Sequence, residues 1–126
     1  MGDFKQSRTT VPNLTVSGDL TIQGDTTTVS STNTVIKDKF IELGNGTSGT
    51  PSGDAGIVIE RGDSDNVIMG WDESTDSFVV GTTSATGAST GDLTITPTAL
   101  NTGDITVGSG VAADTMIVFD GNAQDY

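Results

Sequence analysis

A six-residue repeat near the start of the chain is the feature that most limits its fold. Three consecutive frames cover residues 13–18, 19–24 and 25–30, and each of the first two places apolar side chains at positions i and i+2 before a Gly-Asp turn. A side-chain period of two is that of a β-strand. Strands of three or four residues are not stable alone and must pack on neighbours. The repeat therefore predicts short stacked β-strands, within one chain or between chains.

The same period recurs along the rest of the sequence. Short apolar runs bounded by Gly, Asp, Asn or Ser occur at residues 57–59, 67–69, 78–80, 93–95, 105–107 and 116–119. Gly, Asn, Asp and Ser are the residues that turns require. No window has apolar residues at the i, i+3, i+4 and i+7 spacing of an amphipathic helix. We expect an all-β chain.

Two hairpin signals lie in the middle of the chain. Residues 62–65 separate two apolar runs, and residues 72–76 separate Trp71 from Phe78. Polar turn residues between apolar runs are typical of β-hairpins. Residues 56–81 are thus predicted to form a three-stranded antiparallel meander within a sandwich-like module. Its predicted core consists of Ile57, Ile59, Val67, Ile68, Trp71, Phe78 and Val80.

The composition leaves little material for a core within one chain. Hydrophobic residues make up 33% of the 126 residues and aromatic residues 5%. Chains this poor in large side chains often gain burial from copies of themselves. A single-chain β-helix and a trimeric fibre both fit the repeat, and we favour the fibre because the six-residue frame lapses after about four units. The side chains expected to face the trimer axis are Leu14, Val16, Leu20, Ile22 and Val29.

The charge is strongly acidic and unevenly distributed. The chain carries −12 in total, of which −2 falls in residues 1–61 and −10 in residues 62–126, where there is no basic residue. Nucleic acids and anionic membrane surfaces would be repelled. The sequence also contains no run of about 18 apolar residues and no apolar secretory leader. We expect neither nucleic-acid binding nor membrane insertion.

Catalytic and metal-binding residue types are scarce. The chain has no His and no Cys, so the commonest general base and the thiolate ligands are missing. We expect no enzymatic activity and no cofactor. Ca²⁺ binding by acidic turns is an alternative, because Ca²⁺ takes carboxylate and carbonyl oxygens, although turn chemistry alone explains acids there. The acids concerned are Asp63, Asp65, Asp72, Glu73 and Asp76.

Two blocks of the sequence carry a family resemblance. The first is the stretch from Asn13 to Gly44, whose matching residues begin at Leu20 and include TTTVSSTN and IKDKFIELG. The second comprises DAGIVIERG from Asp54 and GWDESTDSF from Gly70. Together they cover about half of the chain. They resemble tail-fibre and other virion structural proteins of tailed bacteriophages, especially marine cyanophages. The resemblance implies a homotrimeric, β-rich appendage that joins the virion and leads toward host recognition, and it brings no catalytic residues.

These observations predict a domain order and a function. We expect a docking arm over residues 1–12 that contacts a virion protein through Phe4, Lys5 and Arg8. A repetitive β shaft (13–44), a Gly/Ser/Thr loop (45–53), the meander module (54–96) and further repeat strands that begin another β module (97–126) would follow. The expected protein is the N-terminal part of a tail fibre on the virion, with itself and tail, baseplate or adaptor proteins as partners. Host-surface glycans are candidate ligands of a distal region.

Rival functions come from other classes of protein. A capsid decoration protein or a carbohydrate-binding adhesin would also be β-rich, and in the adhesin the single Trp71 would stack on a sugar ring. A polysaccharide depolymerase would need paired carboxylates such as Asp72 and Asp76. These two acids lie in one short turn, and Trp71 is the single nearby aromatic residue that could help to form a cleft. The enzymatic alternative is therefore disfavoured.

Overall fold

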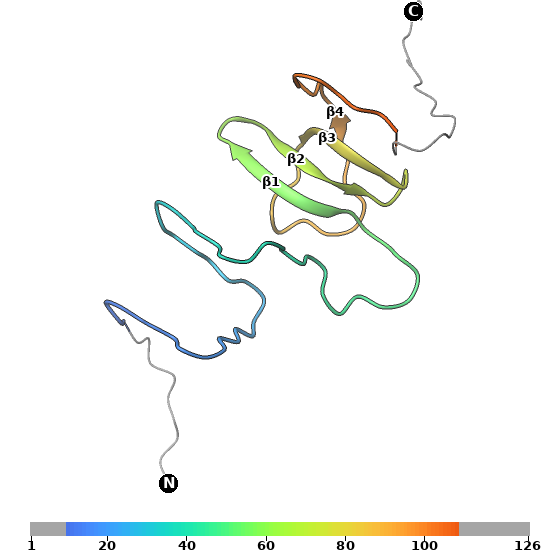
Figure 1. Ribbon diagram of the computed structural model, residues 1–126. Coiled ribbons are helices and arrows are strands. Elements are labelled where there is room, and N and C mark those ends of the chain that lie inside the picture. Colours follow the sequence, from blue (N-terminus) through green and yellow to red (C-terminus); the bar gives the residue numbers. More distant parts are fainter. Residues whose placement is uncertain (1–9, 109–126) are drawn as a thin grey trace, which may run out of the picture. The chain divides into compact units, whose positions relative to one another are not determined.

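The computed structural model describes residues 10–108 (Figure 1). The chain divides into two units, residues 1–39 and 40–126, which are considered separately. In the described part of the first unit, residues 10–39, no strand or helix forms and every residue is exposed. The predicted intertwined shaft needs strands from several chains, so it stays a prediction.

The second unit contains a four-stranded antiparallel sheet with the order β1-β2-β3-β4. The strands are β1 (Ala55–Arg61), β2 (Ser64–Asp72), β3 (Ser77–Thr83) and β4 (Thr96–Pro97). The described residues contain no helix. The predictions of a helix-free chain and of an antiparallel meander are confirmed for this part of the chain, and β4 adds a short fourth strand.

The hairpin turns form where the sequence places them. Gly62 and Asp63 connect β1 to β2, and Gly62 has a φ of 72°, in the left-handed region that glycine adopts without strain. The β2–β3 turn contains Asp76 with a φ of 50°. Asn and Asp tolerate this region better than other residues that carry a side chain. Asp76 therefore has a conformational role in this turn.

One face of the sheet is covered by the connection between β3 and β4, residues 84–95 (Figure 1). Ile68, on β2, lies beneath this connection and is 2% exposed. It is the one apolar side chain that is buried within residues 10–108. Burying such a side chain stabilises a fold by about 1.5–3 kcal/mol, so apolar burial within a single chain is small.

Hydrogen bonds hold the covering connection in place. The Asn66 side chain donates to the carbonyl of Ala85 (2.9 Å), and the hydroxyl of Thr83 accepts from the N–H of Ala85 (3.1 Å). Further along, the Thr86 N–H donates to Ser89 Oγ (3.0 Å) while the Ser89 N–H donates to the Thr86 carbonyl (3.0 Å). Polar bonds thus replace part of the apolar packing that this chain lacks.

Candidate functional site

The register of the strands divides the sheet into two faces of different character. Residues that pair across neighbouring strands point to the same side, and successive residues along a strand point to opposite sides. Val58 pairs with Ile68, which pairs with Gly81, so these three lie on the covered face. Ile57 pairs with Met69, which pairs with Val80, on the opposite face.

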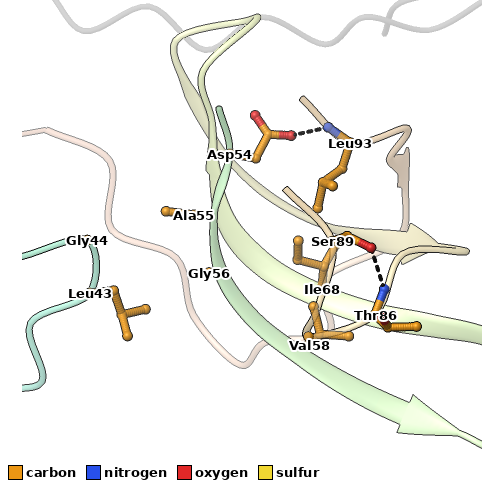
Figure 2. Close-up of a pocket in the computed structure, with 11 residues that line it drawn as sticks. Leu43, Gly44, Asp54, Ala55, Gly56, Val58, Ile68, Thr86, Ser89 and Leu93 are labelled. Atoms are coloured by element: carbon orange, nitrogen blue, oxygen red, sulfur yellow. Dashed lines mark hydrogen bonds between the residues drawn. The ribbon is translucent and has the colours of Figure 1, made fainter. Parts of the chain in front are cut away.

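The covered face borders an open cavity of about 300 Å³ between the sheet and the β3–β4 connection (Figure 2). Its apolar lining includes Val58, Ile68 and Leu93. At one end the Asp54 carboxylate accepts hydrogen bonds from the N–H groups of Leu93 (2.8 Å) and Glu73 (2.9 Å). The carboxylate is therefore engaged in holding the chain together. Within the described part of the chain, no buried side-chain nitrogen or oxygen lacks a hydrogen-bond partner.

The opposite face, called the apolar face below, is uncovered and is the candidate functional surface. Phe78 is 84% exposed, Met69 57%, Ile59 56% and Ile57 51%. Its remaining apolar side chains are half-buried. The apolar face consists of Ile57, Ile59, Val67, Met69, Trp71, Phe78 and Val80. A contiguous apolar surface of this kind marks an interaction site more often than a free surface.

An aromatic pair lies at one end of the apolar face. Trp71 and Phe78 are cross-strand partners, and their ring centroids are 5.1 Å apart at an interplanar angle of 82°. This edge-to-face arrangement is favourable for aromatic rings. The indole N–H of Trp71 donates to the Glu73 carboxylate (3.0 Å), which fixes the ring against the strand end. The sheet thus holds this part of the surface rigidly.

The centre of the apolar face carries no charged side chain. The nearest charged residues along its strands stand at the ends, Arg61 and Asp65 beside the β1–β2 turn and Glu73 after β2. The chain as a whole has a net charge of −12. The surface is therefore a neutral apolar area on an acidic protein, which favours contact with another apolar surface.

The acidic β2–β3 turn is organised by one carboxylate. Asp72 accepts hydrogen bonds from the Ser74 hydroxyl (2.6 Å), the Ser74 N–H (2.9 Å) and the Thr75 N–H (3.2 Å). The hydroxyl of Ser74, followed by the Thr75 groups, lowers the pKa of Asp72 below its ordinary value of 3.8. Within the residues that the structure describes, no three acidic, His or Cys side chains are grouped so as to hold a metal ion.

The titration of Asp72 gives a pH-dependent prediction. Because the pKa of Asp72 is lower in the folded state, its ionised form stabilises the fold above pH 3.8, and this contribution is lost as the pH falls through the lowered pKa. Asp72→Asn keeps an acceptor oxygen but does not titrate. The wild-type melting temperature should therefore fall more steeply than that of Asp72→Asn between about pH 5 and about pH 2. Equal slopes in calorimetry would contradict this role.

The site residues predicted from the sequence are those of the docking arm, of the trimer axis and of the module core. Phe4, Lys5 and Arg8 lie outside the described residues. The five predicted axis residues are all exposed in the single chain, at 43–71%. They are Leu14, Val16, Leu20, Ile22 and Val29. Their burial between chains is untested and stays a prediction.

The predicted module core does not form a single core within one chain. Of the seven predicted core residues, one, Ile68, lies on the covered face. The other six belong to the apolar face: Ile57, Ile59, Val67, Trp71, Phe78 and Val80. The physical reason is the strand period, since Val67 and Ile68 are adjacent and must point to opposite sides. Met69, absent from the predicted list, joins the apolar face by the same alternation. Strict application of that alternation would have found it.

Comparison with known proteins finds no matching family model, no similar curated protein and no similar solved structure. No helix in the described residues is long and apolar enough to cross a membrane.

Proposed function

We propose that this chain is a structural protein of a bacteriophage virion, the N-terminal part of a homotrimeric tail fibre that attaches to the particle and supports host recognition. Its role would be mechanical, with repeated short strands forming a stiff link between the virion and more distal parts of the fibre. The resemblance of residues 20–44 and of the blocks beginning at Asp54 and Gly70 supports this assignment.

The observation that carries the proposal is that most large apolar side chains of the described residues are exposed to solvent in a single chain. Among residues 10–108, eighteen large apolar side chains are exposed and one is buried. Each Å² of apolar surface left in water forgoes about 25 cal/mol of stabilisation. Four of the eighteen lie together on the apolar face, and the largest contiguous apolar patch of a soluble protein is often a functional surface. An assembly of several copies supplies the missing burial.

The finer architecture belongs to the same proposal. Residues 13–44 would form an intertwined shaft, with the apolar pair of each repeat directed toward the threefold axis. Residues 54–96 would pack in a sandwich-like module, and residues 1–12 would dock on a tail, baseplate or adaptor protein. Such a protein needs neither a cofactor nor catalytic residues. A distal region of the fibre would contact the host.

The stoichiometry can be measured on the purified full chain. Light scattering should give three times the chain mass of 12.8 kDa, about 38 kDa. Cryo-electron microscopy of the particle that carries the protein should place three copies in each tail appendage. A monomeric mass would contradict the trimer, and a position on the capsid shell would instead identify a decoration protein.

A further inference from the structure

We propose that the apolar face is an interface between copies of this chain, and that the faces of the copies pack against one another around the symmetry axis of the assembly. The inference takes the number of copies in the assembly from the proposed function and rests on it in that respect. It goes beyond that function by naming the surface through which the meander modules of different copies contact one another. The residues concerned are those of the apolar face, with Phe78 as the most exposed and Met69 at its centre.

Charge favours contact between copies at this surface. Two copies of a chain with a net charge of −12 repel each other wherever their acidic surfaces meet. Two copies can meet at the centre of the apolar face without bringing carboxylates together, because Asp65 and Glu73 stand at its two ends. A basic partner, by contrast, would gain most by binding the acidic turns and nothing by covering this face.

Area also favours a copy of the chain over a foreign partner. Three strands about 4.8 Å apart and about seven residues long, at ~3.4 Å per residue, give a footprint of roughly 340 Å². Two such surfaces together bury about 700 Å², well below the ~1,600 Å² of a stable two-protein interface. A partner bound only here would bind weakly. A second copy makes further contacts through its own residues 14–29, whose apolar side chains are equally uncovered.

The apolar face and residues 14–29 belong to one chain, so contacts between copies at one of them favour contacts at the other. Once one segment of the copies has assembled, the modules are held at a high effective concentration, and even a small interface then closes. Phe78 would be its anchor, because an aromatic side chain buries about 150–250 Å² and such residues dominate interface energies. The Trp71–Phe78 pair is already ordered in the single chain, so little side-chain freedom is lost on contact.

The native chain contains its own reporter for this contact. Trp71 is the single tryptophan, it lies on the apolar face, and it is half-buried in one chain. As the full-length protein assembles with rising concentration, Trp71 emission should shift to shorter wavelength. Quenching by acrylamide should fall at least about twofold, as expected when water is excluded from an interface.

Crosslinking tests the proximity of the faces directly. The chain has no cysteine, so a single one can be introduced without background. Met69→Cys, treated with a short bismaleimide, should give covalently linked pairs of chains in high yield. Thr90→Cys is the matched control, since Thr90 is exposed in the β3–β4 connection away from the apolar face. It should give at least about tenfold less product.

A charged substitution tests the energetic contribution. Phe78→Asp should weaken assembly at least about tenfold in sedimentation equilibrium, whereas Thr90→Asp, which adds the same charge off the face, should leave it unchanged. Because Phe78 is 84% exposed, the single chain loses mainly the ring contact with Trp71, and an unchanged circular dichroism spectrum will verify folding.

The outcomes separate this inference from the proposed function. A trimer in which Trp71 stays fully quenchable and Met69→Cys does not crosslink overturns the interface but leaves the fibre proposal standing. A dimer with crosslinked faces supports the interface and contradicts the homotrimer. A monomer contradicts both, and a monomer with shielded Trp71 would mean that the chain covers its own apolar face.

Discussion

Gly56→Ala is expected to destabilise the sheet by about 3 kcal/mol or more, because the new methyl group has no space. A Cβ atom at Gly56 would lie 2.5 Å from the carbonyl oxygen of Met69 and 2.7 Å from the Cα atom of Gly70. Both neighbours are backbone atoms of β2, the strand that pairs with β1. These atoms cannot move aside unless the two strands separate. The substitution therefore weakens the pairing of β1 with β2, whereas a clash with a side chain could be relieved by a change of rotamer.

Gly87→Ala is the matched control for this substitution. A Cβ at Gly87 would meet no atom within 4 Å, and the residue lies in the β3–β4 connection of the same unit. Thermal unfolding should place Gly56→Ala on the order of 10 °C or more below the wild type, and Gly87→Ala close to it. Similar melting temperatures for the two variants would show that β1 and β2 do not approach as closely as the structure indicates.

The local features of the sheet could be predicted from the sequence because they depend on neighbouring residues. The Gly62-Asp63 turn lies between two apolar runs, and the acidic stretch ending at Asp76 separates Trp71 from Phe78. Turn chemistry and a period of two are local signals, and together they specify an antiparallel meander. The confirmed part of the fold rests on these signals.

The choice of face could not be settled in the same way. Val67, Ile68 and Met69 are all apolar, so composition alone does not tell which side of β2 is covered. The answer depends on where the β3–β4 connection runs, and that segment begins at Ser84, sixteen residues after Ile68 in the sequence. The opposed glycines Gly56 and Gly70 belong to the same class of feature. Each resembles a turn residue in sequence, yet together they permit a close approach of two strands.

Long-range hydrogen bonds also leave no local signal in the amino-acid sequence. Asp54 follows a Gly-rich loop, where an acidic residue is ordinary turn chemistry. In the structure it bonds to Glu73, nineteen residues away, and to Leu93, thirty-nine residues away. The Asp54 N–H also donates to the Gly91 carbonyl (3.0 Å). No local pattern distinguishes such a tethering carboxylate from the other acids of the chain.

Asp54→Ala should therefore loosen the β3–β4 connection and lower the stability of the sheet. The substitution removes the acceptor for two backbone N–H groups, and a hydrogen bond to a charged group contributes about 1.5–3 kcal/mol. Asp54 is half-buried, so solvent replaces part of the loss, and we expect a net destabilisation of about 2–4 kcal/mol. Asp54→Asn keeps one acceptor oxygen and should fall between this variant and the wild type.

Asp92→Ala is the control that distinguishes the loss of the Asp54 hydrogen bonds from the loss of one negative charge. Asp92 is exposed in the same connection, and its removal changes the net charge by the same amount. Hydrogen exchange followed by NMR should show faster exchange at the Leu93 and Glu73 amides in Asp54→Ala than in Asp92→Ala, because only the former loses their acceptor. If both variants exchange alike, relief of acidic repulsion rather than the Asp54 bonds governs the connection. The covered face would then depend on apolar packing by Leu93 and Ile68 and on the hydrogen bonds of Asn66 and Thr83 to Ala85.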